Sequence, residues 1–420
     1  MLKKKLSQEV EEMDKLILFT SSFPFGNKET YLEREMDFLS EAFETVEIYP
    51  HYYNQGNKTQ RKVPKNVKVH EAALPIQKSK RLIQSLKGLF KGAKVGLFLK
   101  EFFSKKVYKS KANFKSWLIT MVDYMATVGS HQYNAVKREQ NAVFYFYWGF
   151  GWSYMILNFD QAKSCKSYIR LHGSEVYLER SNGYIPLRTQ LFQKTDFLLP
   201  ISNNLATYLK NRYKVLSEKI KVSRLGVFMP EDLSKEEDVV SEEMHLVSCS
   251  NMIKLKRIDM IVESLKAFEG TPIKWIHFGD GPEMNTIKEQ INAANFKTIK
   301  VELVGRKDNT EVLGYYKSNP IDAFVNVSKH EGVPVSAMEA MSCKIPCIAT
   351  NVGATAELVN NENGILLNED FSINELVQSL HEVRKGNQWN SKREIAYTYC
   401  NEYFNAKKNY EQLSKALKKN

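Results

Sequence analysis

The sequence lacks an apolar run long enough to cross a membrane. The nearest approach is Phe144–Phe159, which is too short, is rich in Tyr and Trp, and is interrupted by glycines. The N-terminal segment MLKKKLSQEVEEMDK has neither an apolar core nor a small-residue cleavage site, so we expect no signal peptide. These absences favour a cytoplasmic protein over an integral membrane protein or a secreted one.

Cysteine is also scarce, with five residues among 420. Their odd number and scattered positions are typical of a reducing compartment, not of a disulfide-bonded secreted protein. Cys343 and Cys347 have the spacing of half a metal site, but no second pair and no nearby histidine completes it. We therefore expect buried thiols at these positions.

Acidic residues are nearly missing from one stretch of a chain whose formal net charge is +12. Between Lys78 and Lys115 there are twelve lysines or arginines and a single acid, Glu101. Apolar residues recur there at about helical spacing, namely Leu82, Leu86, Leu89, Phe90, Leu97, Phe98 and Phe102. A basic amphipathic helix suits an anionic membrane surface, whereas nucleic-acid binding is disfavoured because no nucleic-acid module accompanies the charge. The alternative is an ordinary packed helix with solvated lysines.

Short apolar runs alternate with amphipathic stretches along the whole chain. We expect strands at residues 15–22, 45–52, 142–148, 167–173, 196–202, 220–226, 245–251, 273–281, 300–306, 323–328, 346–350 and 364–367. Helical patterns separate them, for example at Ile258–Phe268 and Ser372–Arg384. Strands that alternate with helices predict parallel sheets that are covered on both faces.

The expected elements fall into two halves around a polar, acidic linker at residues 228–244. We therefore predict an α/β protein with two Rossmann-like, doubly wound domains, at residues 1–227 and 245–400. The first domain carries a basic helical insert at about residues 78–137. A C-terminal helix at residues 401–420 is expected to pack back on the first domain. Two such domains are expected to form a ligand cleft between the carboxyl ends of their sheets.

The segment SKHEGVPVSAMEAM, Ser328–Met341, follows one of the expected strands. Gly332 lets the backbone approach a ligand closely, and Pro334 suits the first turn of a helix. The backbone amides of Val335 and Ser336 would then point out of the helix start, where phosphate is attracted.

Two carboxylates, Glu331 and Glu339, flank this expected anion site. A carboxylate accepts hydrogen bonds from two neighbouring hydroxyls, as sugars and ribose present them. The pair is therefore placed to bind the two ends of a nucleotide-sugar. For Glu339 a structural explanation remains open, because Ser336 and Glu339 have the spacing of a helix capping box.

The segment EGVPVSAMEAM, followed by IPCIATNVGATAELV and NGILL, resembles the signature of glycosyltransferase family 4, whose members are retaining enzymes with the GT-B fold. NMIKLKRIDMIVESL, WIHFGDGPEM and ELVGR precede it in the family's order. In the first half, FPFGNKETYLEREMDFLS and YIRLHGSEVYLERSNGYIPLR are similar to bacterial members that build lipid-linked polysaccharides. The resemblance implies two Rossmann-like domains that face each other across a cleft.

The resemblance also implies roles for individual residues. It gives donor-sugar binding to Glu331, ribose binding to Glu339, and a place at the reacting centre to His172, Lys256 and Glu331. The implied donor-binding residues are Gly26, Asn251, Lys256, Arg257, Gly279, Gly281, Gly305, Arg306, Glu331, Gly332, Val333, Val335, Ser336 and Glu339. The implied acceptor-binding residues are Arg170, His172, Glu175 and Arg188.

The chain departs from the family at one position, because Asn251 stands where the family has a phosphate-binding arginine, five residues before Lys256. Asparagine brings no charge and no bidentate fork, so Lys254 or Arg257 would have to compensate. For Gly279 and Gly281, close approach to a ligand and the shaping of a turn remain equally open.

We thus predict a glycosyltransferase that moves a sugar from a nucleotide-sugar, UDP more than GDP, to a lipid-linked or free saccharide in bacterial surface polysaccharide synthesis. The chain has no Asp-x-Asp triplet, so we expect neither a metal ion nor a cofactor. The expected location is the inner face of the cell membrane, as a peripheral protein. Two alternatives stay open: a catalytically weak glycosyltransferase-like partner, and glycoside hydrolysis by two carboxylates that flank a glycosidic bond.

Overall fold

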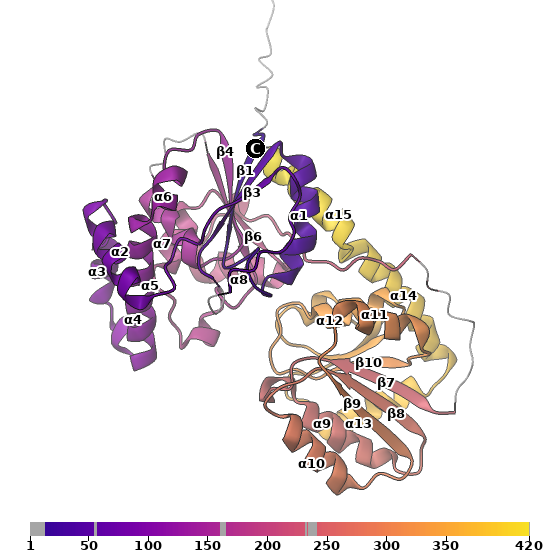
Figure 1. Cartoon of the computed structure of the whole chain (residues 1–420). Helices are drawn as coiled ribbons and strands as arrows, with labels where there is room; N and C mark the ends of the chain where they lie inside the picture. Colours follow the sequence, from indigo (N-terminus) through magenta and orange to yellow (C-terminus); the bar gives the residue numbers. More distant parts are fainter. Residues whose placement is uncertain (1–12, 54–56, 160–164, 232, 234–241, 420) are drawn as a thin grey trace, which may run out of the picture. The chain divides into compact units, whose positions relative to one another are not determined.

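The computed structural model describes residues 13–53, 57–159, 165–231, 233 and 242–419. It divides into two compact units (Figure 1). Unit 1 comprises Met1–Ser223 with Tyr410–Asn420, and unit 2 comprises Arg224–Asn409. Within the expected linker at 228–244, residues 232 and 234–241 lie outside the described part of the chain.

Unit 1 is built on a six-stranded parallel sheet in the order β3-β2-β1-β4-β5-β6. Its strands are β1 (Lys15–Thr20), β2 (Thr45–Pro50), β3 (Val67–Val69), β4 (Ala142–Phe146), β5 (Lys166–Leu171) and β6 (Phe197–Pro200). Its helices are α1 (Thr30–Ala42), α2 (Lys78–Phe90), α3 (Gly96–Phe102), α4 (Lys105–Tyr108), α5 (Lys111–Gly129), α6 (His131–Val136), α7 (Arg188–Lys194) and α8 (Asn203–Tyr213), with the 3-10 segments η2 (Gly151–Asn158), η3 (Leu178–Ser181) and η4 (Ser217–Lys219).

The central strands of unit 1 are near-continuous apolar runs because both faces of the sheet are covered. In β1, KLILFT, all residues after Lys15 are buried. The C-terminal helix α15 (Ala406–Lys418) adds Leu413 and Leu417 to this core, next to residues of α1 and the central strands. Helices α2 to α5 form a separate group at one side of the unit (Figure 1).

Unit 2 has a second six-stranded parallel sheet, in the order β12-β11-β10-β7-β8-β9. Its strands are β7 (Met244–Cys249), β8 (Ile273–Phe278), β9 (Ile299–Gly305), β10 (Ala323–Asn326), β11 (Cys347–Thr350) and β12 (Gly364–Leu367). Its helices are α9 (Ile258–Leu265), α10 (Met284–Ala294), α11 (Asn309–Ser318), α12 (Val335–Ser342), α13 (Ile373–Val383) and α14 (Asn387–Tyr403), with the 3-10 segments η5 (Lys254–Lys256), η6 (Lys266–Phe268) and η7 (Thr355–Glu357).

The two parallel sheets confirm the expected α/β class, but two details differ from the sequence-based prediction. The segment 220–226 is not a strand: it forms one isolated bridge, between Ile220 and Leu198 of β6, which is too little pairing for a ladder. The strand β3 was missed because three residues are too few to show an alternating pattern. Among the described helices, none combines the length and the apolar character that a bilayer crossing requires.

Candidate functional site

Two of the residues expected at the reacting centre, Lys256 and Glu331, meet in unit 2. Lys256 ends η5, which follows β7, and Glu331 lies in the loop after β10. Because β7 and β10 are neighbouring parallel strands, these loops leave the sheet at the same edge. The Nζ of Lys256 lies 2.6 Å from Oε1 of Glu331, and Nδ2 of Asn326 donates to the same oxygen at 3.3 Å. The result is a partly buried charge pair at the carboxyl edge of the sheet.

The loop that carries Glu331 leads directly into α12. This helix begins at Val335, and Pro334 precedes it instead of occupying its first turn. The carbonyl of Pro334 accepts a helical hydrogen bond from the N–H of Ala337 at 3.1 Å. The N–H groups of Val335 and Ser336 therefore have no acceptor within the helix. An anion placed beside Glu331 would meet these amides and the positive end of the helix dipole.

The carboxylate of Glu339 is not explained by a capping box. Such a box needs Ser336 at the N-cap, but α12 begins one residue earlier and Ser336 is helical. Oε1 of Glu339 instead accepts a hydrogen bond from Nδ2 of Asn309 at 2.6 Å. Asn309 opens α11, after β9, and no pattern in the sequence had singled it out. Glu339 thus joins the second turn of α12 to the first turn of α11.

Gly279 and Gly281 allow a close approach of the chain's own backbone. A Cβ on Gly279, where φ is +144°, would lie 1.8 Å from the carbonyl oxygen of Ser250. A Cβ on Gly281 would lie 2.4 Å from the carbonyl oxygen of Met252. Of the two explanations left open by the sequence, the structure supports the shaping of the backbone. Both glycines hold the loop that presents the exposed side chain of Asn251.

Gly305 and Arg306 lie at the end of β9, beside this loop. The carbonyl of Gly305 accepts a hydrogen bond from the N–H of Gly279 at 2.8 Å. A Cβ built on Gly305 meets no atom of the described chain within 4 Å, and the side chain of Arg306 is exposed. The end of β9 therefore borders open space at the same edge of the sheet as Glu331.

In unit 1, His172 follows β5 and lies among two aromatic rings and a carboxylate. Its ring centroid is 5.0 Å from that of Tyr147 and 4.3 Å from that of Trp148. Its Nδ1 is 3.5 Å from Oε1 of Glu175, which also accepts the backbone N–H of His172 at 2.8 Å. Both ring nitrogens are buried and lack a hydrogen-bond partner within the described residues. Burial raises the pKa of Glu175, but the contacts with His172 outweigh it and leave this pKa below its ordinary value.

Arg170 has a structural role, contrary to the expected contact with an acceptor. Its side chain is fully buried, and its guanidinium donates to Oε2 of Glu35 at 2.7 Å and to the hydroxyl of Tyr145 at 3.1 Å. The pair joins β5 to α1 inside the core. A ligand in solvent does not reach such a group.

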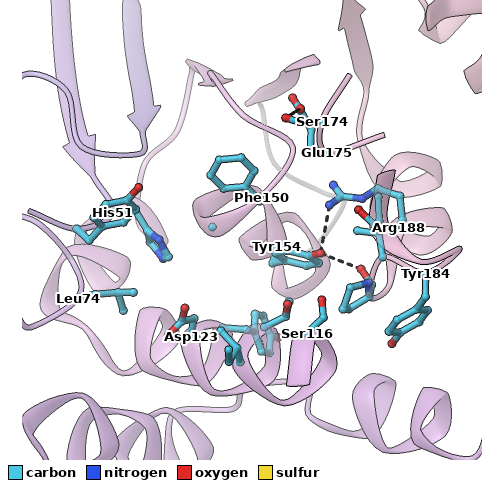
Figure 2. A pocket seen from close by; sticks show the side chains of 18 of the residues that line it. His51, Leu74, Ser116, Asp123, Phe150, Tyr154, Ser174, Glu175, Tyr184 and Arg188 are labelled. Atoms are coloured by element: carbon cyan, nitrogen blue, oxygen red, sulfur yellow. Dashed lines mark hydrogen bonds between the residues drawn. The ribbon is translucent and has the colours of Figure 1, made fainter. Parts of the chain in front are cut away.

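The two other expected acceptor residues, Glu175 and Arg188, line a cavity of about 510 Å³ within unit 1 (Figure 2). The cavity is bordered by His51, Tyr52, Leu74, Arg81, Ser116, Ile119, Thr120, Asp123, Tyr124, Phe150, Gly151, Tyr154, Ser174, Glu175, Ser181, Tyr184, Ile185, Pro186 and Arg188. Arg188 donates to the carbonyl of Gly149 and, at 3.4 Å, to the hydroxyl of Tyr154. One wall comes from α5, so the helical insert contributes to this hollow.

The cavity combines aromatic faces with polar groups. Arg81 lies 3.3 Å from Asp123 across the gap between α2 and α5. His51 is neutral, because burial and then the positive charge of Arg81 lower its pKa to about 3. Phe150 is partly exposed beside it. Flat apolar rings next to hydrogen-bonding pairs are chemically suited to a saccharide.

Gly26 lies in the loop after β1, where we expected contact with the donor phosphates. The carboxylate of Glu29 occupies that loop and accepts hydrogen bonds from the backbone N–H groups of Ser21, Ser22 and Phe23 and from Nε1 of Trp148, at 2.7–2.9 Å. The amides expected to face a ligand anion are therefore paired with the chain's own carboxylate. Sequence reasoning had not singled out Glu29.

No group of three or more His, Cys, Asp or Glu side chains in the described ranges is arranged to hold a metal ion. Cys343 and Cys347 are both buried free thiols, as expected from the sequence.

Comparison with known proteins assigns unit 2. Residues 230–402 match the family model described as Glycosyl transferases group 1. Unit 2 is a glycosyl transferases group 1 domain. A protein of Escherichia coli named as a colanic acid biosynthesis glycosyltransferase, WcaL, is 28% identical over 47% of this chain and 50% of its own length. The N-acetyl-alpha-D-glucosaminyl L-malate synthase of Bacillus anthracis is 26% identical over 44% of this chain and 45% of its own. The chain thus spans about half the length of the curated relatives it matches.

Solved structures extend the likeness to both units. The lipopolysaccharide outer core galactosyltransferase WaaB in its apo form aligns with a TM-score of 0.67 over 96% of this chain and 99% of its own, at 15% identity. Anabaena HepE in complex with UDP and glucose aligns with a TM-score of 0.59 over 97% and 99%, also at 15% identity. At such identities the likeness concerns the fold, which is GT-B.

In the group 1 domain, Arg257 does not replace the charge that is missing at Asn251. Its Nε and Nη2 donate to the backbone carbonyls of Val327 and Ser328 at 2.6 Å and 3.2 Å. The guanidinium therefore fastens the loop that leads to Glu331. Its expected contact with a donor is not supported by this geometry.

Proposed function

We propose that this protein transfers a sugar from a nucleotide-sugar to a saccharide acceptor, with retention of configuration and without a metal ion. The observation that carries the proposal is the pairing of Lys256 with Glu331 next to the open amides of Val335 and Ser336. A diphosphate would bind these amides and the ammonium group, while the freed carboxylate of Glu331 would accept hydroxyls of the donor sugar.

The other end of the donor is assigned to Glu339 and Asn309. Their hydrogen bond at 2.6 Å holds the carboxylate at the edge of the sheet, where it would accept the two ribose hydroxyls. We propose UDP rather than GDP as the carrier. This is supported by fold neighbours solved with UDP, among them Anabaena HepE with UDP and glucose.

The acceptor is assigned to the cavity of unit 1, with Glu175 and Arg188 as polar contacts and Phe150 and Tyr154 as apolar faces. We propose a lipid-linked saccharide in bacterial surface polysaccharide synthesis. The relatives named for colanic acid and amylovoran synthesis support this direction. The proposed location is the inner face of the cell membrane.

In the proposed reaction, the acceptor hydroxyl attacks C1 of the donor sugar from the side on which the diphosphate leaves. The bond from C1 to the phosphate oxygen breaks, a bond from C1 to the acceptor oxygen forms, and the hydroxyl proton passes to the leaving phosphate. The helix start of α12 and Lys256 would stabilise the charge that develops on the diphosphate. His172 would orient the reacting groups.

A catalytically weak glycosyltransferase-like partner is the second candidate. The specific observation in its favour is that Asn251 carries no charge, while the guanidinium of Arg257 donates hydrogen bonds to backbone carbonyls. Glycoside hydrolysis is less well supported, because its two carboxylates must flank a glycosidic bond, whereas the carboxylate of Glu331 is paired with the ammonium group of Lys256 at 2.6 Å.

The test is thermal stabilisation of the purified protein by UDP-, GDP-, ADP- and dTDP-sugars, with and without EDTA. A donor at a hundred times its Kd adds about 2.7 kcal/mol of stability, which is visible as a shift of Tm. We expect a shift with UDP-sugars that EDTA does not change, followed by transfer to an acceptor. Binding without any transfer or donor hydrolysis would favour the weak partner, and no shift with any donor would overturn the proposed site.

A further inference from the structure

The helical insert of unit 1 exposes its large apolar side chains. In the described chain, nineteen large hydrophobic residues are exposed, and twelve of them lie between residues 76 and 119, about a tenth of the sequence. They are Ile76, Leu82, Ile83, Leu86, Leu89, Phe90, Leu99, Phe103, Tyr108, Phe114, Leu118 and Ile119. We call these residues the insert surface. A concentration of this kind marks an interaction site, whereas isolated exposed apolar residues are ordinary.

The cause lies in the way α2 packs against α5. The buried residues of α2 are Ser85 and Gly88, not its leucines. A Cβ on Gly88 would lie 1.9 Å from the carbonyl oxygen of Met125, and a Cβ on Gly129 would lie 2.0 Å from that of Gln84. The two helix backbones therefore touch at a pair of glycines, and no room is left there for larger side chains.

Polar groups complete this contact. The hydroxyl of Ser85 donates to the carbonyl of Val122 at 3.1 Å, and Nε2 of Gln84 donates to the carbonyls of Ala73 and Ala126 at 2.8 Å. The small and polar side of α2 thus faces the protein. Its apolar stripe faces outward, where Leu82 is 59% and Phe90 93% exposed. This orientation contradicts the ordinary packed helix that the sequence had left open.

Positive charge surrounds the insert surface. The exposed cations of this stretch are Lys78, Lys80, Lys87, Lys91, Lys94, Lys100, Lys105, Lys106, Lys109, Lys111 and Lys115. The one acid, Glu101, is turned inward: its carboxylate accepts hydrogen bonds from the hydroxyl of Tyr184 at 2.8 Å and from the N–H of Leu187 at 2.9 Å. Between Lys78 and Lys115, every charged side chain that is fully exposed is therefore basic, and it lies among exposed apolar side chains.

We propose that the insert surface docks on an anionic lipid bilayer, with Phe90 and Phe103 inserted among the headgroups and the lysines paired with lipid phosphates. Apolar side chains that are partly buried in the interface and cations that meet an anionic leaflet are the two terms of peripheral membrane binding. A protein partner with an acidic face would match the charge, but it is the less favoured occupant, because large rings of which 93% and 82% are exposed suit insertion among lipids. The inference names the surface that would hold the protein at the proposed membrane location, and it does not depend on the transfer reaction.

The position of Ile119 connects the insert surface with the cavity of unit 1. It belongs to the insert surface and also lines the cavity of unit 1, together with Arg81 of α2. If the cavity binds the saccharide of a lipid-linked acceptor, docking would bring its mouth to the membrane from which that acceptor extends. This consequence rests on the proposed function, whereas the docking itself does not.

The experiment is flotation of the full chain with vesicles of phosphatidylcholine alone and with added phosphatidylglycerol, at about 0.15 M salt. We expect binding to the anionic vesicles and little to the neutral ones. The double variant Phe90→Ser/Phe103→Ser and the triple variant Lys80→Glu/Lys87→Glu/Lys100→Glu should each bind at least about tenfold more weakly. Leu216→Ser and Lys317→Glu, which replace an exposed apolar residue and an exposed lysine outside the insert surface, should bind as the unchanged protein does.

Binding that both sets of variants retain, or no binding to anionic vesicles, would overturn the proposal. Sedimentation velocity tests the competing occupant, a second copy of the chain. If the unchanged protein is a dimer and the Phe90→Ser/Phe103→Ser variant is a monomer, the insert surface is a contact between two copies and the lipid proposal is overturned. Thermal stabilisation by UDP-sugars, measured on the same variants without lipid, separates this inference from the proposed function. Loss of lipid binding with retained donor binding in the insert variants supports the present inference. The same loss in the Leu216→Ser control would overturn it and leave the proposed function untouched.

Discussion

The sheets of unit 1 and unit 2 have the same strand order, yet the residues at their carboxyl edges differ. In both, the first strand of the unit lies at the centre and the chain turns to opposite sides of it. In unit 2 this edge presents a charge pair, Lys256 with Glu331, and a helix start whose first amides have no acceptor within the helix. In unit 1 the amides after β1 are occupied by Glu29, and aromatic rings surround His172.

The difference shows that a common topology leaves the chemistry of the edge to the loops. Unit 2 leaves donors open for an anion, as a nucleotide diphosphate requires. Unit 1 pairs the amides after β1 with Glu29 and instead offers a hollow with polar and aromatic walls. This contrast supports the proposed placement of the charged donor in unit 2 and of the hydroxyl-rich acceptor in unit 1.

The largest effect is expected from the charge pair of unit 2. Glu331→Ala should lower sugar transfer by about 10²- to 10³-fold or more, because contacts with the donor sugar are lost where the bond breaks. Binding of the free nucleotide diphosphate should persist, because the amides of α12 and Lys256 remain. Turnover assays measure the loss of transfer, and calorimetric titration with UDP measures the retained nucleotide binding. Glu362→Gln, an exposed carboxylate of the same unit, is the control, and full turnover of Glu331→Ala would refute the assignment.

The buried pair of unit 1 should affect stability instead of binding. Arg170→Met leaves Glu35 as an unpaired buried carboxylate, and removal of one partner of such a pair costs about 3–5 kcal/mol of unfolding free energy. Denaturant unfolding measures this loss. The double variant Arg170→Met/Glu35→Leu should recover most of it, since no charge then stays buried. A variant of unchanged stability that binds acceptor less well would restore Arg170 to the acceptor site.

Each unit also buries a neutral histidine, and acid should destabilise both. Burial and Arg81 lower the pKa of His51 in unit 1 to about 3. Burial lowers that of His277 in unit 2 to about 4, although a hydrogen bond to Ser250 opposes it. Since the unfolded chain binds a proton near pH 6.5, the stability due to each neutral ring is complete above that pH and declines as the pH falls.

The expected loss is up to about 3 kcal/mol per histidine at pH 4. Below pH 4 the loss due to His277 levels off first, whereas that due to His51 continues. Calorimetric unfolding of His51→Gln and His277→Gln at a series of pH values checks this, because each variant should lose its own part of the pH dependence. An identical dependence in both variants and the parent protein would contradict the lowered pKa values of the two histidines.

The smallest effect is expected at the ribose end of the donor site. Asn309→Ala removes one hydrogen bond to Glu339, which contributes about 0.5–1.5 kcal/mol, so UDP should bind a few-fold more weakly. Glu339→Ala should weaken UDP further, because the ribose loses its acceptor. Titration calorimetry compares the two, with Asn319→Ala, which lies at the other end of α11, as the control. Equal affinity for all three variants would remove Glu339 and Asn309 from the site.

Much of unit 2 could be predicted from local pattern. Its strands are short apolar runs between turns, and the loop around Glu331 carries a glycine, a proline and two acids at fixed spacing. Such features depend on residues close together in the chain, so the parallel sheet and the helix start were expected from them. A common centre for Lys256 and Glu331, which are 75 residues apart, was expected only through the family resemblance. The contact of Asn309 with Glu339 was not, because 30 residues separate them and no pattern joins them.

By itself, the sequence determined the α/β class, most of the strands and the order of chemical groups along unit 2, because periodicity and turn residues act locally. Only the tertiary structure decided which polar groups form hydrogen bonds or ion pairs within the protein and are therefore not available to a ligand. Arg170 and Arg257 look like ligand-binding arginines in the sequence but meet Glu35 and backbone carbonyls in the fold. The outward direction of the apolar stripe of α2 was also decided by the tertiary structure. Gly88 of α2 and Gly129 of α5 are far apart in the sequence, and the close contact of the two helix backbones at these glycines orients α2.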